Sequence, residues 1–144
     1  MKNTLLLLIV VFSLASCTKD NEITIEEYLE QHGLVAQKHS SGIYYIIEKE
    51  GTGGHPNVNS FVTMNYKGYF LNDEQFDSSY DRGEPLKYYL NGLILGWQIG
   101  VPLFKKGGKG KLFIPPEYGY GSNPPTGIPK DATLIFDIEL IDFK

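Results

Sequence analysis

The sequence has little of the chemistry that most enzymes use. Cys17 is the single cysteine, so no disulfide can form within the chain. The three histidines, His32, His39 and His55, are scattered and lack the spacing of metal ligands. Neither a G-x-S-x-G nucleophile motif nor a phosphate-binding P-loop occurs. We therefore expect a function that needs no metal, no cofactor and no covalent nucleophile.

An excess of positive charge is also missing. The chain carries 13 Lys and Arg against 17 Asp and Glu, a formal net charge of -4. A DNA or RNA duplex would repel such a chain, so we expect no nucleic acid partner. Residues 105–111 are basic and rich in glycine, but they lack the P-loop ending and predict a solvated turn before a strand.

Long apolar runs are few, and Leu5 to Leu14 is too short to span a bilayer, which takes about 20 apolar residues. Together with Lys2 it is typical of a signal peptide. The sequence Leu14-Ala15-Ser16-Cys17 follows and resembles the lipobox of bacterial lipoproteins, in which the cysteine is lipidated. We expect residues 1–16 to be a lipoprotein signal peptide. Cys17 would then anchor the protein to the cell envelope, at the periplasmic face or the cell surface of a bacterial outer membrane. The alternative is an ordinary signal peptide followed by a chance cysteine.

Residues 17–40 predict a polar tether followed by a short helix. Thr24 is a good helix N-cap, and acidic residues follow it in the first turn, where they suit the helix dipole. Gly33 can end the helix. One apolar face of the helix is expected from Ile25, Tyr28 and Leu29.

Residues 41–144 predict one α+β domain. The 16 glycines and 8 prolines of the chain separate short β-branched and aromatic stretches. Strands are expected at residues 43–48, 61–70, 87–90, 110–114 and 133–141. Residues 76–79 predict a turn, and the only later helix is expected within 93–104, where Pro102 limits its end. Because strands and helices do not alternate, we expect a curved antiparallel sheet packed around a short helix.

The last expected strand indicates cover on both faces of the sheet. Leu134, Phe136, Ile138 and Leu140 fall on one face. Ile135 lies on the other face, which predicts at least partial cover there too.

Several aromatic and glycine-rich motifs follow one another in a fixed order. They are Val62 to Gly68, Phe76-Asp77-Ser78-Ser79, Gly96-Trp97, Gly100-Val101, Leu112 to Pro116, Tyr118-Gly119-Tyr120-Gly121, Ile128-Pro129 and Ala132 to Leu140. At these residues, and over about 41–143, the chain resembles the FKBP-type peptidyl-prolyl isomerases. The resemblance implies an antiparallel sheet wrapped around a short helix, with a proline-binding pocket between them.

The resemblance also implies the residues of that pocket. The catalytic set is Tyr66, Phe76, Asp77, Trp97, Tyr120 and Phe136, and the substrate-binding set is Arg82, Leu86, Leu93, Ile94 and Ile128. Trp97 would be the floor beneath the proline ring, with Tyr66, Phe76 and Phe136 as walls. Tyr120 would offer its hydroxyl to the peptide, and Asp77 would be the one charged group in the pocket.

The implied rim is the part that differs most from other members of the family. Leu86 stands where many members have an aromatic wall, and a shorter connection leads through Leu93 to Ile94. The backbone N–H of Ile94, at the start of the helix, would hold a substrate carbonyl. Ile128 would close the rim, and Arg82 would orient Asp77 or Tyr66.

We therefore expect a monomeric peptidyl-prolyl cis-trans isomerase that assists the folding of exported, proline-containing polypeptides. The uncatalysed rotation about a peptide C–N bond has a barrier of roughly 18–20 kcal/mol, because this bond has partial double-bond character. Two alternatives stay open: a non-catalytic, proline-binding chaperone module, and a structural or adhesion lipoprotein of the envelope. Taken singly, Trp97, Tyr66 and Phe136 are typical of a core, and Asp77 is typical of a turn cap.

Overall fold

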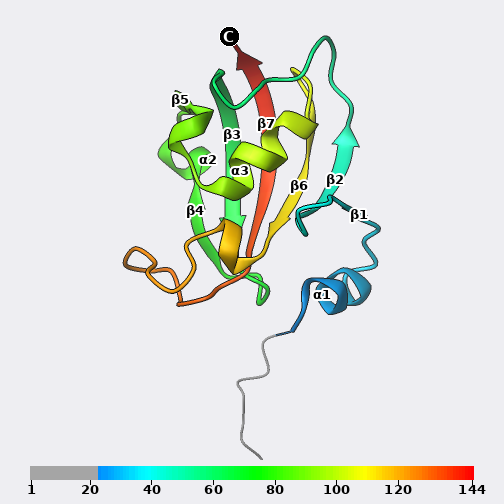
Figure 1. Ribbon diagram of the computed structural model, residues 1–144, viewed down its shortest axis with the longest axis vertical. Helices are drawn as coiled ribbons and strands as arrows, with labels where there is room; N and C mark the ends of the chain where they lie inside the picture. The colour runs from blue at the N-terminus through cyan, green and yellow to red at the C-terminus, as the bar shows by residue number, and fades with distance from the viewer. Residues whose placement is uncertain (1–22) are drawn as a thin grey trace, which may run out of the picture.

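The computed structural model describes residues 23–144 (Figure 1). The expected signal peptide, the expected lipidation site Cys17 and the expected tether up to residue 22 lie outside these described residues. Within residues 23–144, no helix has the length and apolar character needed to cross a bilayer.

The core of the fold is a curved sheet in which every strand pairing is antiparallel. The strands are β1 (Gln37–Lys38), β2 (Tyr44–Lys49), β3 (Phe61–Tyr69), β4 (Gln75–Ser78), β5 (Leu86–Tyr89), β6 (Lys109–Ile114) and β7 (Leu134–Phe143). Their order is β1-β2-β6-β7-β3-β4, and β5 also pairs with β3. The expected α+β architecture is confirmed. The sequence pattern missed β1, whose two residues are both polar and exposed.

Among residues 23–144, three short α-helices accompany the sheet (Figure 1). They are α1 (Ile25–Gln31), α2 (Ser79–Arg82) and α3 (Leu95–Gly100), with 3-10 turns at η1 (Leu90–Gly92), η2 (Val101–Leu103) and η3 (Pro116–Tyr118). The helix expected within 93–104 is therefore shorter than predicted. Pro102 has no N–H to donate to the helix, and the chain tightens into η2 instead.

The turn expected at residues 76–79 is wrong, because these residues complete β4 and begin α2. Ser78 is the N-cap of α2, where its hydroxyl accepts a hydrogen bond from the backbone N–H of Asp81 at 3.3 Å. Gly83 ends the helix with φ of 75°, a left-handed conformation that suits glycine.

The two faces of the sheet bury separate hydrophobic clusters. Figure 1 shows α3 lying across one face, and the main cluster forms there from Trp97, Leu112, Phe136 and their neighbours. On the other face, Ile135 and Phe113 pack with the apolar side of α1. The expected alternation along β7 is therefore confirmed, and α1 supplies the second cover.

The predicted helix α1 is confirmed, and both its start and its position on the sheet are fixed by hydrogen bonds. Thr24 and Glu27 form a reciprocal capping box, with distances of 3.1 Å from Glu27 N to Thr24 Oγ1 and 2.7 Å from Thr24 N to Glu27 Oε2. The Tyr28 hydroxyl donates to Asp73 Oδ1 at 2.6 Å. This bond attaches the helix to the turn between β3 and β4.

Glycines allow the closest contacts of the fold. A Cβ added at Gly96 would lie 2.4 Å from Ile114 Cγ2, and one at Gly100 would lie 2.6 Å from Leu112 Cδ1. Helix α3 therefore rests directly on the side chains of β6. At Gly110 the constraint is tighter, because an added Cβ would lie 1.8 Å from the backbone oxygen of Ile46.

We expect Gly110→Ala to lower the free energy of unfolding by about 3 kcal/mol, at the upper end of the range for overpacking. The neighbouring atom is backbone and cannot rotate away, so β2 must separate from β6. Gly54→Ala is the control, because a Cβ there meets nothing within 4 Å. Urea unfolding measures both variants. Equal midpoints for the two would contradict the close contact of β2 and β6.

Candidate active site

A small pocket of about 120 Å³ opens between α3 and the sheet. Nine residues line it: Tyr66, Phe76, Asp77, Leu86, Leu93, Ile94, Trp97, Tyr120 and Phe136. The structure thus brings nine of the eleven expected site residues to one cavity. Arg82 and Ile128 stand outside this lining, although both lie close to its members.

Aromatic rings form the floor and walls of the pocket. Trp97 is 4% exposed, and its ring meets those of Tyr66 and Phe136 edge to face, with centroids 4.9 and 5.0 Å apart. Phe76 meets Phe136 in the same way at 5.6 Å. Edge-to-face packing fixes each ring against its neighbours. The pocket therefore presents a rigid, apolar surface to a ligand.

One polar network stands at the edge of this apolar surface. The Tyr66 hydroxyl donates to Asp77 Oδ2, and Arg82 pairs with Asp77 Oδ1. Arg82 Nη2 also donates to the Tyr66 oxygen at 2.8 Å. Arg82 therefore contacts both of the groups that it was expected to orient.

In this network the charge of the Asp77 carboxylate is balanced by Arg82, and the phenol of Tyr66 stays protonated. Asp77 Oδ1 also accepts the backbone N–H of Ser78 at 2.8 Å. Burial, followed by the hydrogen bond to Asp77, raises the pKa of Tyr66 to about 12. The hydroxyl of Tyr66 thus stays a donor at neutral pH, and Asp77 meets the ligand as a compensated charge.

The pairing of β3 with β4 places these groups together. Asp77 lies opposite Gly68, and a Cβ at Gly68 would lie 2.6 Å from Phe76 Cζ and 2.9 Å from Phe136 Cε1. Glycine at this position lets the two wall rings meet. Gly68 had no predicted role, although it ends the motif Val62 to Gly68.

Ser79 is a second residue whose role the sequence analysis missed. Its side chain is fully buried, and its hydroxyl accepts the backbone N–H of Tyr66 at 2.9 Å. This bond holds the backbone of Tyr66 beside the start of α2. A buried serine has no sequence signal that separates it from a solvent-exposed one.

Tyr120 and Ile94 line the pocket, and Ile128 stands outside this lining. Tyr120 is 37% exposed, and burial together with the charge of Asp77 raises the pKa of its hydroxyl. Ile94 is the N-cap of α3, and its carbonyl accepts from the Trp97 N–H at 2.9 Å. Ile128 packs against the main cluster from the loop before β7.

In residues 23–144 we find no group of His, Cys, Asp and Glu side chains that could hold a metal ion. The residues that line the pocket offer aromatic surface, hydroxyl donors and one balanced carboxylate. Such a site can bind a compact apolar ring and hydrogen-bond the peptide carbonyls beside it.

Comparison with known proteins agrees with this geometry. Residues 53–141 match the family described as FKBP-type peptidyl-prolyl cis-trans isomerase. The chain belongs to this family.

Among relatives, the chain is 44% identical over 127 residues to the FKBP-type peptidyl-prolyl cis-trans isomerase FkpA of Escherichia coli K12. This match covers 87% of the chain and 47% of the relative. FkpA of Buchnera aphidicola subsp. Schizaphis graminum is 48% identical over 124 residues, which cover 85% of the chain and 48% of that relative. The chain thus spans about half the length of these curated relatives.

Solved structures give the same result. The crystal structure of E. coli FkpA matches with a TM-score of 0.77 at 44% identity, covering 83% of this chain and 57% of that one. The crystal structure of AtFKBP13 matches with a TM-score of 0.71 at 31% identity, covering 76% of this chain and 99% of the other.

If the pocket catalyses the isomerisation of Xaa-Pro peptides, Asp77→Asn should slow this reaction roughly tenfold, a barrier increase of about 1.4 kcal/mol. Without the carboxylate, the charge of Arg82 stays uncompensated beside the bound amide and stabilises its planar, dipolar form. The ion pair of Asp77 with Arg82 is partly exposed. Its loss should therefore change the free energy of unfolding by less than about 1 kcal/mol.

Asp81→Asn is the matched control, since it removes the same charge from an exposed residue whose bond is to Gln75. Turnover should be unchanged in this control. A stability loss without a loss of turnover in Asp77→Asn would show that Asp77 only supports the local structure.

Proposed function

We propose that this chain is a peptidyl-prolyl cis-trans isomerase that acts on proline-containing polypeptides. The observation that carries the proposal is the aromatic pocket, whose one carboxylate is already balanced by Tyr66 and Arg82. Cis/trans isomerisation breaks no covalent bond, so the reaction needs neither a nucleophile nor a proton transfer. The family of the chain and the names of its relatives support the same reaction.

The proposed mechanism rests on binding the amide away from water. The proline ring lies on Trp97, between the rings of Tyr66, Phe76 and Phe136, which offer apolar faces to its C–H edges. Water stabilises the planar amide more than the twisted one, because the planar form carries more charge on its oxygen. A pocket that excludes water therefore lowers the barrier to rotation about the C–N bond.

Donors at the mouth hold the peptide on both sides of the rotating bond. The Tyr120 hydroxyl lines the pocket and can donate to one substrate carbonyl. The backbone N–H of Ile94, where the chain enters α3, can donate to another. Leu86 and Leu93 complete an apolar mouth, which favours a bulky apolar residue before the proline.

We expect a protein of residues 18–144 to accelerate cis-to-trans conversion across a panel of Xaa-Pro peptides, most strongly with Leu or Phe before the proline. Trp97→Leu should keep the fold, since it retains an apolar side chain, and should weaken peptide binding. A protease-coupled or NMR exchange assay measures the rates. Peptide binding without any rate increase would instead support a non-catalytic binding module.

We also propose that the protein is an envelope lipoprotein, anchored through Cys17. The support is the sequence alone: an apolar run ends at Leu14-Ala15-Ser16-Cys17. A lipid anchor would leave the pocket to act on newly exported chains. Their prolines isomerise in tens to hundreds of seconds without a catalyst.

Mass spectrometry of the mature N-terminus tests the anchor. We expect cleavage before Cys17 and a cysteine that carries at least two acyl chains, because one chain binds membranes only marginally. Cys17→Ser should lose this modification, while the isomerase activity of the folded domain stays the same. An unmodified Cys17 on a protein recovered free of membranes would refute the lipoprotein assignment.

A further inference from the structure

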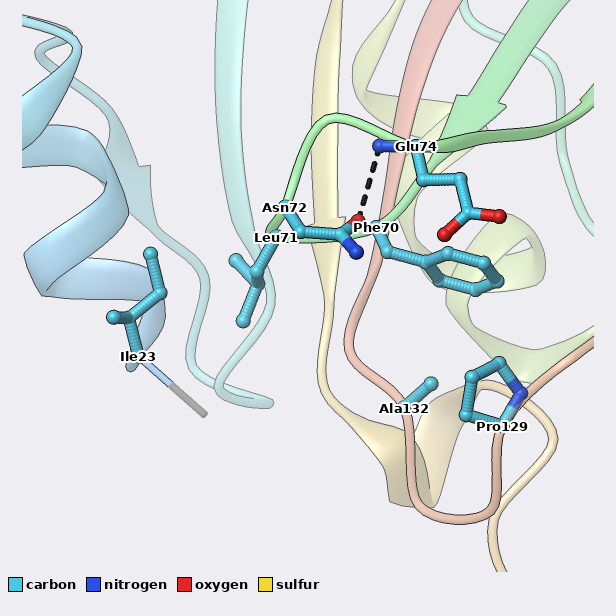
Figure 2. Close-up of a pocket in the computed structure, with 7 residues that line it drawn as sticks. All are labelled: Ile23, Phe70, Leu71, Asn72, Glu74, Pro129 and Ala132. Carbon is cyan, nitrogen blue, oxygen red and sulfur yellow. Dashed lines mark hydrogen bonds between the residues drawn. The ribbon is translucent and has the colours of Figure 1, made fainter. Parts of the chain in front are cut away.

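A second and larger hollow of about 390 Å³ lies outside the proline pocket (Figure 2). Its walls come from the residue before the N-cap of α1, from the turn between β3 and β4, and from the loop that enters β7. The lining residues are Ile23, Phe70, Leu71, Asn72, Glu74, Pro129 and Ala132. None of them belongs to the proposed catalytic machinery.

One aromatic ring of the hollow adjoins an aromatic ring of the proline pocket. The Phe70 ring lines the hollow and lies 4.8 Å from the Phe76 ring, which lines the pocket. The loop before β7 adds a second connection. There Ile128 packs against the main cluster, and the next residue, Pro129, lines the hollow. The two cavities are therefore neighbours, although no residue lines both.

The chemistry of the hollow suits an extended peptide. Phe70, Leu71 and Ala132 give it an apolar interior. Asn72 Oδ1 accepts the backbone N–H of Glu74 at 3.0 Å, and Figure 2 shows the amide group of Asn72 held above the hollow by this bond. The NH₂ group of Asn72 is then available to donate to a backbone carbonyl.

We propose that this hollow is a second binding site for the client chain whose proline occupies the pocket, and that it binds an apolar side chain of that client. The inference rests on the proposed isomerase function, and it adds a sequence preference at a distance from the proline. Binding energy from a remote part of a substrate raises kcat/KM when it helps to hold the reacting bond.

The aromatic rings between the proline pocket and the hollow limit the distance between the two sites. Steps of 5.0, 5.6 and 4.8 Å link the centroids of Trp97, Phe136, Phe76 and Phe70. An extended peptide advances about 3.3 Å per residue. The centroids of Trp97 and Phe70 are therefore at most about 15 Å apart, a distance that an extended peptide covers in roughly five residues.

Peptides with a single Leu placed two to eight residues from the proline, on either side, test the spacing. Each is compared with the same peptide carrying Ser at that position. We expect Leu to raise kcat/KM about tenfold at one or two neighbouring spacings of up to about five residues, on one side of the proline only. Equal rates for Leu and Ser at every position would overturn the proposal.

Two substitutions from different elements test the place of binding. Ile23→Asp and Pro129→Asp each put a charge into the hollow. Val35→Asp is the matched control, at a side chain that is 91% exposed. Both hollow variants should abolish the Leu advantage and leave turnover of a short Xaa-Pro peptide unchanged. An advantage that survives in both variants would overturn the proposal.

Binding measurements separate this inference from the isomerase proposal. If no peptide is isomerised faster than in buffer, the isomerase proposal fails, and fluorescence anisotropy of labelled peptides then decides on the hollow. Tighter binding of the Leu peptide, lost in Ile23→Asp and Pro129→Asp, supports a peptide site. Equal affinities for the Leu and Ser peptides overturn it.

Discussion

Helix α3 lies so close to the sheet because glycine stands at two of its contact points. Gly96 faces Ile114, and Gly100 faces Leu112, at distances that no side chain would allow. Trp97 lies between these glycines in the sequence, so the close approach of α3 places it against the sheet. There its ring meets the rings of Tyr66 and Phe136 edge to face. Larger residues would lift the helix and the pocket floor together. The position of the floor of the proposed proline site therefore depends on close contact between the backbone of α3 and the side chains of β6.

The fold was predictable where side chains alternate strongly. Along β7 the pattern correctly separated the residues of the main cluster from Ile135, which α1 covers on the other face. The pattern of apolar residues did not predict the elements that consist of polar residues. Strand β1 is two exposed residues that pair only with β2. Helix α2 depends on the hydroxyl of Ser78, in a stretch that also has the composition of a turn. Local composition cannot separate these outcomes, because tertiary pairing decides between them.

For the site, family resemblance named the residues, and the structure adds how they are held. The motifs brought Tyr66, Phe76, Trp97 and Phe136 together, but no spacing rule predicts that the Tyr66 hydroxyl is bound by both Asp77 and Arg82. That arrangement follows from the register of β3 against β4 and from the turn of α2. The larger hollow had no sequence signal at all, since its lining comes from separate segments that fold side by side.

The balance of charge in the pocket agrees with the reaction proposed for it. A free carboxylate or guanidinium beside the amide would interact most strongly with the planar, dipolar form and would oppose rotation. Here each charge is bound to the other, and Tyr66 stays protonated with a pKa of about 12. The pocket is thus apolar where the amide twists and polar only where carbonyls are held. Lowering the barrier by about 5 kcal/mol, from roughly 20 to 15, would raise the rate by more than a thousandfold. Removing water lowers the barrier by the difference in hydration between the planar and twisted forms, which is one part of the roughly 2–7 kcal/mol that an amide loses in an apolar environment.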